Sequence, residues 1–393
     1  MNNFHFYSPT EFVFGRGSEN EAGELVKKYG GSKVLVHFGG GSAVRSGLLG
    51  RVTASLTAAG VPYIELGGVK PNPRDTLVYE GIELCRREGI DFILCVGGGS
   101  VIDSAKAIAA GVLYDGDFWD FYSGKAAVRK ALPVGTVLTI AAAGSEGSGD
   151  TVVTQEATGL KRGAGGDALR PRFSIMNPEL TCTLPPFHTA CGAADIMAHV
   201  FERYFTNTTE VEITDRLCEA VLCTMVKEAP RVIADPNNYD ARANIMWAGT
   251  VAHTNIVGVG RDQDWNSHNI EHELSGLYDV AHGAGLAVIM PAWMEFVMPH
   301  NPMRFAQVAT RVWGCAMDFE HPENTALAGI RCFRRFLREI GLPINFAELG
   351  AREEDIPVLV QKLGLGEGRT GGFVHLNSED VAQIYRIAAH ADV

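Results

Sequence analysis

The first half of the chain alternates short apolar, β-branched runs with longer segments of helical periodicity. The apolar runs have the length of buried strands, and several of the helical segments between them end in glycine, a residue that commonly terminates helices. Strands that alternate with helices pair in parallel, so we expect one α/β sheet. The expected strands lie at 32–38, 62–68, 91–97 and 131–140, and the expected helices at 44–60, 73–89 and 99–111.

The pattern changes near Pro185 and Pro186. Beyond these prolines the periodicity is almost entirely helical, as in segments 188–205, 212–233 and 239–256, and β-rich runs are scarce. We therefore predict two domains, an α/β domain over residues 1–180 followed by an all-helical domain over residues 181–393.

Composition narrows the class of protein. The net charge of −12, without a long Lys or Arg run, argues against nucleic-acid and anionic-membrane partners. The eight cysteines form no CxxC pair, which favours buried thiols in a reducing compartment over disulfides or a cysteine zinc site. There is no signal-peptide pattern and no apolar run of the roughly 18 residues that span a bilayer. We expect a soluble cytoplasmic protein.

Two GGGS turns are the first segments that indicate a ligand-binding site. The second, Gly97 to Ser100, joins an expected strand to an expected helix. Glycines allow a ligand to approach the backbone, and a helix start offers free N–H groups to a phosphate or pyrophosphate, although such glycines also serve tight packing alone. The first turn, Gly39 to Ser42, lies where dinucleotide folds meet the adenosine ribose. It carries no carboxylate to bind a 2′-hydroxyl, which favours NADP(H) over NAD(H).

The helical half contains five candidate metal ligands. Asp195 and His199 are four residues apart, as are His268 and His272, so each pair lies on one face of a helix. His282 follows ten residues after His272. A carboxylate with imidazoles suits a divalent metal such as Fe²⁺ or Zn²⁺, although a single i,i+4 pair is more often structural. The HExxH motif of zinc proteases is absent from this segment.

These segments resemble the iron-containing (group III) alcohol dehydrogenases, most closely the NADPH-dependent butanol dehydrogenase and aldehyde reductase branch. The resemblance spans nearly the whole chain. It begins with FxFxxPTEFVFGRGSE, similar to an N-terminal hairpin, continues through PNPR, GGGSVIDSAK, GSE and LKRG, and is most specific in DIMAHVFE and WNSHNIEHELSGLYDVAHGAGLAVIMP. It implies a Rossmann-like domain followed by a helical domain, the architecture of dehydroquinate synthase, and a homodimer.

The resemblance also implies roles for individual residues. One divalent metal is held by Asp195, His199, His268 and His282, and His272 lies beside it and relays protons. The family often has threonine where this chain has Ala143, so one cofactor hydrogen bond is in doubt. The implied cofactor contacts are Gly39, Gly40, Gly41 and Ser42 at the 2′-phosphate end, Gly97, Gly98, Gly99, Ser100 and Asp103 toward pyrophosphate and nicotinamide, and Asn72, Thr139 and Lys161.

The expected reaction is reversible hydride transfer between a nicotinamide and a primary alcohol or aldehyde, with the metal as Lewis acid. Three alternatives remain. A lyase of the dehydroquinate synthase type would need basic residues near the metal for a phosphate-bearing substrate, and the segments around His268 and His282 show no such cluster. A metal hydrolase would make the glycine turns purely structural, and a non-catalytic scaffold would leave them unexplained.

Overall fold

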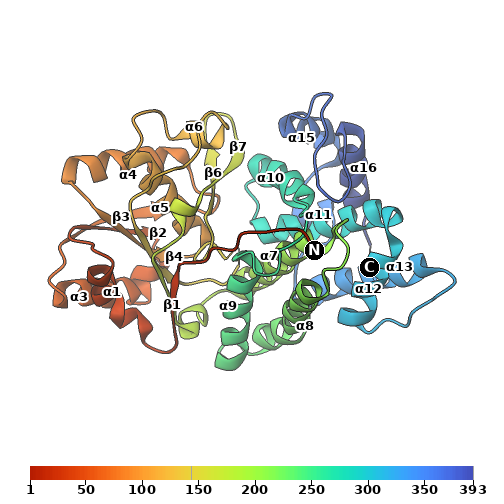
Figure 1. Ribbon diagram of the computed structural model, residues 1–393, viewed down its shortest axis with the longest axis horizontal. Helices are drawn as coiled ribbons and strands as arrows, with labels where there is room; N and C mark the ends of the chain where they lie inside the picture. Colours follow the sequence, from red (N-terminus) through yellow and green to blue (C-terminus); the bar gives the residue numbers. More distant parts are fainter. Residues whose placement is uncertain (143, 393) are drawn as a thin grey trace. The chain divides into compact units, whose positions relative to one another are not determined.

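The computed structural model describes residues 1–142 and 144–392, so Ala143 lies outside the described residues. The chain forms two compact units (Figure 1). The α/β unit contains Tyr7–Thr183, and the helical unit contains Leu184–Val393 together with Met1–Phe6. The first six residues thus belong with the helical unit, because the Asn2 N–H donates to the Gly260 carbonyl at 2.8 Å.

The α/β unit is built on a six-stranded parallel sheet. Its strand order is β1-β8-β5-β4-β2-β3, and a separate antiparallel pair is formed by β6 and β7. Apolar, β-branched residues fill both faces of the central strands, as expected for a parallel sheet covered by helices. The strands are β1 (Glu11–Phe14), β2 (Val34–Gly39), β3 (Tyr63–Val69), β4 (Phe92–Gly97), β5 (Val134–Leu138), β6 (Asp150–Gln155), β7 (Leu160–Gly165) and β8 (Phe173–Met176).

Helices cover this sheet. The one that matters most for the site is α5, whose buried face is lined by small and branched residues, so it lies close to the strands. This arrangement, with the helical second unit, confirms the predicted fold class. The helices of the unit are α1 (Ala22–Lys28), α2 (Ser42–Arg45), α3 (Leu48–Ala58), α4 (Asp75–Glu88), α5 (Gly99–Val112) and α6 (Trp119–Tyr122).

Two features of the sheet differ from the sequence expectations. The expected N-terminal hairpin is wrong: β1 is a single strand that pairs in parallel with β8, about 160 residues later in the chain. The β6–β7 hairpin was not anticipated either, because its residues 150–165 include polar and glycine positions that do not read as strands. In both cases the contacts of the folded chain, and not the local sequence pattern, decide that these residues form strands.

The helical unit is arranged around α7, which is buried along most of its length and packs against α8, α9 and α11. Small residues at positions such as Ala190, Ala193, Ala194 and Ala198 allow these neighbours to approach closely. The helices are α7 (Pro186–Tyr204), α8 (Glu212–Ala234), α9 (Tyr239–His253), α10 (Asn266–Tyr278), α11 (His282–Val297), α12 (Pro302–Trp313), α13 (Pro322–Glu339), α14 (Phe346–Leu349), α15 (Ile356–Leu363) and α16 (Ser378–Ala389).

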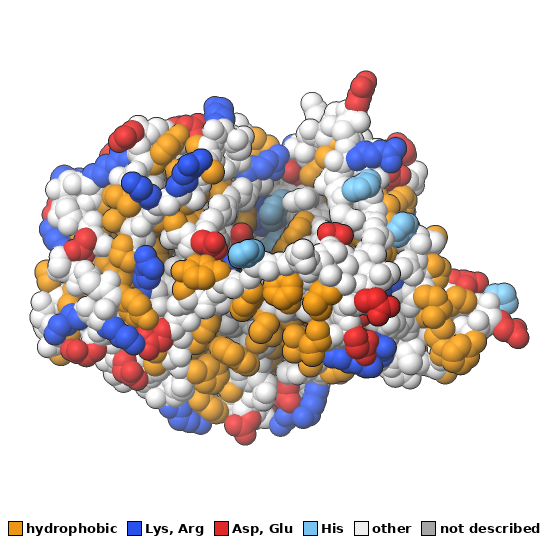
Figure 2. Space-filling model, in the orientation of Figure 1, with side chains coloured by type: hydrophobic (Ala, Val, Ile, Leu, Met, Phe, Trp, Pro, Cys, Tyr) orange, Lys and Arg blue, Asp and Glu red, His pale blue; other side chains and the backbone are white. Residues whose placement is uncertain are grey.

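The surface carries charges of both signs. On the face shown in Figure 2, Lys and Arg side chains are interspersed with Asp and Glu. The acidic residues on this face therefore form no single block. Among the described residues, no helix is both long enough and apolar enough to cross a membrane.

Candidate metal centre and cofactor-binding edge

Helix α7 presents the first two candidate ligands, Asp195 and His199. Their i,i+4 spacing places them one turn apart on the same face, as the sequence predicted. The Nε2 atom of His199 lies 3.3 Å from Oδ1 of Asp195, and only about a twentieth of each side chain is exposed. A carboxylate and an imidazole are thus buried together in the middle of the helical unit.

Helices α10 and α11 bring two more imidazoles to the same carboxylate. The Nε2 atoms of His268 and His282 each lie 3.9 Å from Oδ1 of Asp195. Ligand atoms of Asp195, His268 and His282 all lie within 4.8 Å of one another. Because metal–ligand bonds are about 2.0–2.2 Å long, ligands of one ion stand about 3–4 Å apart. The structure therefore gathers Asp195, His268 and His282 at separations that one divalent ion can bridge, and His199 lies beside Asp195.

Two glutamates orient these imidazoles. Nδ1 of His268 contacts Glu202 at 3.0 Å, and Nδ1 of His282 contacts Glu271. Both carboxylates are fully buried. Metal-binding histidines commonly donate their second N–H to a carboxylate, which fixes the tautomer and leaves the other nitrogen for the metal. The sequence analysis missed both glutamates, although each lies three residues after a predicted ligand, which would have signalled a shared helix face.

The donor set fits a divalent cation. Oδ1 of Asp195 and Nε2 of His268 are buried without a hydrogen-bond partner, an arrangement that costs free energy unless a ligand satisfies them. Burial opposes charge on both groups, but the nearby imidazoles of His199 and His268 hold the pKa of Asp195 well below its usual value. Against the same cost of burial, Asp195 and Glu202 raise the pKa of His268 to about 9. The centre attracts positive charge, which a bound metal would supply.

Two further histidines adjoin the centre. The ring of His272 lies 5.5 Å from the ring of His282, and ligand atoms of His272, His282 and Glu271 form a second close group. The ring of His253 lies only 4.2 Å from that of His199. No sequence signal distinguishes His253, because the nearest candidate ligand along the chain, His268, is fifteen residues away.

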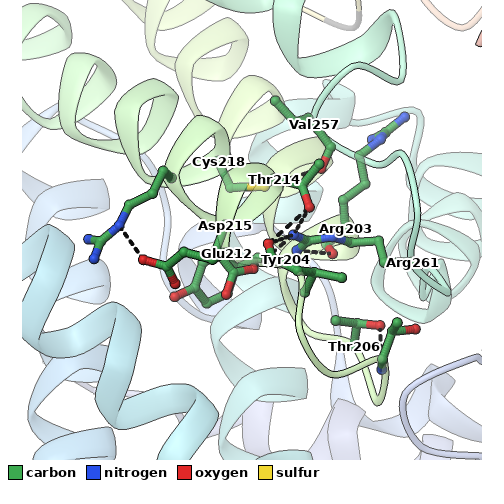
Figure 3. A network of polar contacts seen from close by, with 12 residues as sticks. Arg203, Tyr204, Thr206, Glu212, Thr214, Asp215, Cys218, Val257 and Arg261 are labelled. Atoms are coloured by element: carbon green, nitrogen blue, oxygen red, sulfur yellow. Dashed lines mark hydrogen bonds and ion pairs between the residues drawn. The ribbon is translucent and has the colours of Figure 1, made fainter. Parts of the chain in front are cut away.

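A buried polar network holds α7 to the segment that leads into α10 (Figure 3). Arg261 donates to the carbonyl of Arg203 at 3.1 Å and to the hydroxyl of Thr214, and it pairs with Asp215 at 2.8 Å. Arg203 is the penultimate residue of the helix that carries two candidate ligands, and Arg261 precedes His268 by seven residues. The network therefore links the elements that carry the candidate ligands.

In the α/β unit, the predicted cofactor residues follow neighbouring strands. Gly39, Gly40, Gly41 and Ser42 follow or end β2, Gly97, Gly98, Gly99 and Ser100 follow or end β4, Asn72 follows β3 and Thr139 follows β5. Because these strands are adjacent and parallel, their carboxyl ends lie at one edge of the sheet, which is where α/β proteins bind ligands. The N–H of Thr139 donates to the carbonyl of Gly97 at 3.0 Å, which joins two of these turns.

The turn after β4 leads into a helix N-terminus. Helix α5 begins at Gly99, its N-cap is Gly98, and no side chain caps it. A Cβ at Gly98 would lie 1.9 Å from Cγ2 of Ile140, so close packing alone already requires this glycine. Tight packing therefore accounts for Gly98, and the uncapped start of α5 leaves backbone N–H groups that a phosphate could use.

The remaining predicted cofactor residues lie on and around the β6–β7 hairpin. Lys161 pairs in register with Thr154, whose N–H donates to the carbonyl of Pro73 at 2.8 Å, so this hairpin adjoins the segment that contains Asn72. Asp103 has structural partners: its carboxylate accepts from the Ser145 hydroxyl at 2.6 Å and from a backbone N–H of β6 at 3.0 Å. Asp103 therefore shapes the edge of the sheet whether or not it also contacts a cofactor.

Comparisons with known proteins agree with this geometry. Residues 9–178 match the family model described as iron-containing alcohol dehydrogenase, and residues 189–389 match the C-terminal model of the Fe-containing alcohol dehydrogenase family. The two matches cover both units that the structure separates. They include all the predicted ligands and cofactor residues.

Individual relatives extend over the full chain. A probable NADH-dependent butanol dehydrogenase 1 of Bacillus subtilis is 42% identical over 98% of this chain and 99% of its own. The NADPH-dependent aldehyde reductase YqhD of Escherichia coli is 34% identical over 92% and 93%. The crystal structure of NADH-dependent butanol dehydrogenase A from Thermotoga maritima superposes with a TM-score of 0.96 at 41% identity, covering 99% of both chains. The chain belongs to the iron-containing alcohol dehydrogenase family.

Proposed function

We propose that the protein interconverts primary alcohols and aldehydes by hydride transfer with a nicotinamide cofactor at a metal centre held by Asp195, His199, His268 and His282. The observation that carries the proposal is the buried Asp195 carboxylate, with imidazole nitrogens at 3.3, 3.9 and 3.9 Å. The relatives of this chain include a probable butanol dehydrogenase and an aldehyde reductase. Family membership favours this reaction over the lyase and the hydrolase that the sequence left open.

The residues of the chain would hold and orient the groups that carry out this reaction. A bound divalent metal would supply Lewis-acid stabilisation of the substrate oxygen, and the nicotinamide would supply or accept the hydride. Glu202 and Glu271 hold His268 and His282 with Nε2 toward Asp195. The buried carboxylates and the network at Arg261 keep these donors from rearranging. His282 is about one quarter exposed, so this side of the centre is open to solvent or substrate.

His272 is proposed to pass the proton of the substrate oxygen to solvent, since imidazole titrates near neutrality and its ring lies 5.5 Å from that of His282. We expect His272→Ala to lower kcat about 100-fold and to change the pH profile of kcat, while metal content stays at the wild-type value. Steady-state rates across pH 5 to 10, with exposed His321→Ala as the matched control, test this. Full activity with an unchanged pH profile would remove His272 from the mechanism.

For the cofactor we propose a preference for NADPH. The turn at Gly39 to Ser42 has no carboxylate to repel a 2′-phosphate, and the Arg45 guanidinium adjoins it: Nη1 lies 2.9 Å from where a Cβ on Gly41 would stand. Exposed Lys70, just after β3, adds a second cation near the neighbouring strand end. The names of relatives do not decide the matter, since they include NADH-dependent and NADPH-dependent enzymes.

Position 39 allows a direct test of this preference. A Cβ at Gly39 would meet its nearest neighbours at 3.5 and 3.7 Å, which is ordinary contact, so aspartate fits there. We expect the wild type to favour NADPH in kcat/KM, and Gly39→Asp to shift the ratio toward NADH by about 10- to 100-fold, because a carboxylate repels the phosphate and accepts from a free 2′-hydroxyl. Gly50→Asp, an open position on α3, controls for the added charge. A wild type that favours NADH would overturn the preference but not the reaction.

The reaction itself is tested by the absorbance of reduced nicotinamide with butyraldehyde as substrate. NADPH and NADH are compared before and after chelator treatment, and again after Fe²⁺ or Zn²⁺ is restored. We expect consumption that the chelator abolishes and that added metal recovers. Consumption with neither cofactor, across several aldehydes, would overturn the proposed reaction.

The homodimer that the family resemblance implies, and the cytoplasmic location expected from the sequence, both stay predictions. Light scattering coupled to size-exclusion chromatography measures the first: a dimer would have twice the mass of the 42.3 kDa chain.

A further inference from the structure

Two cysteine thiols lie side by side in the helical unit, on elements that carry none of the proposed metal ligands. Sγ of Cys315 is 3.9 Å from Sγ of Cys332, which follows 17 residues later in the chain. Cys315 lies just after the end of α12 and Cys332 lies on α13, and these two helices pack against each other (Figure 1). Both side chains are partly exposed, so a small molecule in solution can reach them.

Close packing of the two helices brings the thiols together. A Cβ at Gly329 would lie 2.5 Å from Cβ of Ala309, so α13 needs a glycine there to come this near to α12. Gly329 is one turn before Cys332. At the end of α12, Gly314 is left-handed with a φ of 69°, and the N–H of Cys315 donates back to the carbonyl of Ala309 at 3.0 Å. The packed helices therefore hold the backbones of both cysteines.

Hydrogen bonds also restrain the loop that follows Cys315. The N–H of Asp318 donates to the hydroxyl of Thr325 at 2.8 Å, and that hydroxyl donates to the carbonyl of Ala316 at 3.2 Å. The carboxylate of Asp318 accepts from two further backbone N–H groups of the loop. A disulfide joins sulfurs about 2.05 Å apart, and rotation about the Cα–Cβ bonds can supply the remaining approach.

Arg335 distinguishes the two thiols. Its Nη2, one turn after Cys332 on the same helix, donates to the Cys332 sulfur at 3.1 Å. The thiolate is the form of cysteine that attacks a disulfide, and a neighbouring cation favours it. Burial and the neighbouring Cys332 sulfur raise the pKa of Cys315, so Cys315 keeps its proton more strongly. Cys332 is therefore placed to react first and Cys315 to react second.

We propose that Cys315 and Cys332 form a reversible disulfide site that a low-molecular-weight disulfide oxidises. The Cys332 thiolate attacks one sulfur of that disulfide, breaks its S–S bond and releases one thiolate. Cys315 then loses its proton to solvent and attacks Sγ of Cys332, which releases the second thiolate. The two protein thiols are oxidised, the small disulfide is reduced to two thiols once its thiolates are protonated, and α12 becomes linked to α13. In a reducing compartment the site stays a dithiol until such disulfides accumulate.

Peptide mapping detects the bond directly. Trypsin cleaves after Arg331 and so releases residues 312–331 and 332–334 as separate peptides, each with one cysteine. After the folded protein is treated with oxidised glutathione, we expect these peptides to be joined in most molecules, with a mass about 2 Da below their sum. Dithiothreitol should separate them again. The bond constrains the unfolded chain, so the Tm should rise by about 2–5 °C.

Single variants separate the two steps. Cys315→Ser should stop at a mixed disulfide between Cys332 and glutathione, whereas Cys332→Ser should react at least about tenfold more slowly. Arg335→Gln should slow the first step about 3- to 10-fold, because the cation beside the attacking sulfur is lost. Cys223→Ser, which removes an exposed thiol from α8, is the matched control and should form the bond at the wild-type rate.

Three results would overturn the proposal. The first is that the two peptides remain separate after treatment with excess oxidised glutathione. The second is that Cys315 or Cys332 is instead joined to another cysteine or to a second chain. The third is a bond that forms without raising the Tm, since such a bond would strain the folded pair of helices. Far-UV circular dichroism of each variant establishes that the protein is folded.

Discussion

His268→Ala is expected to lose bound metal and catalytic activity together, while the protein remains folded. The Nε2 atom of His268 is a buried donor without a hydrogen-bond partner, 3.9 Å from Oδ1 of Asp195. Its loss removes one ligand and leaves Glu202 without the imidazole that it holds. Metal Lewis-acid stabilisation is worth several kcal/mol, so kcat/KM should fall about 10³-fold or more. Metal content by mass spectrometry should fall from about one ion per chain to nearly none.

Two variants make this result specific. His188→Ala removes an exposed histidine from the same helix as Asp195 and should keep both metal and activity. Glu202→Gln keeps His268 but weakens its orientation, so metal affinity should fall about 10- to 100-fold, less than in His268→Ala. A His268→Ala protein with full metal content and turnover would show that the ligand set is wrong.

Lys106→Met is expected to have the largest effect on stability. Lys106 is fully buried in the α/β unit, and its ammonium donates to the carbonyls of Ser145, Ser148 and Asp150 at 2.7, 3.0 and 2.8 Å. Burial lowers the pKa of this lysine, so these carbonyls supply the compensating partners. Methionine fills a similar volume but leaves three buried acceptors without a donor. We expect a loss of about 3–5 kcal/mol in the free energy of unfolding.

Thermal and urea unfolding measure this loss, and the Tm should fall by on the order of 10 °C. The loop that Lys106 holds also contains Ser145, which donates to Asp103, so NADPH binding should weaken in variants that remain folded. Exposed Lys130→Met, in the same unit, controls for the lost charge. A change of less than about 1 kcal/mol would mean that water replaces the ammonium at these carbonyls.

The sequence by itself determined the fold class and predicted the residues of the candidate site. Short apolar runs and helical periodicity are local patterns, so the α/β half, the helical half and the i,i+4 pair of Asp195 and His199 could be predicted directly from the sequence. The glycine turns could be placed for the same reason, because a strand, a turn and a helix follow one another within 91–112.

Only the tertiary structure decided which distant residues meet. β1 pairs with β8, the Nδ1 atoms of His268 and His282 contact Glu202 and Glu271, and His253 lies 54 residues from the His199 that it contacts. Such contacts depend on how whole helices and strands pack. Packing depends on the burial of many side chains together. The individual residues that it brings into contact therefore carry no periodic pattern in the sequence.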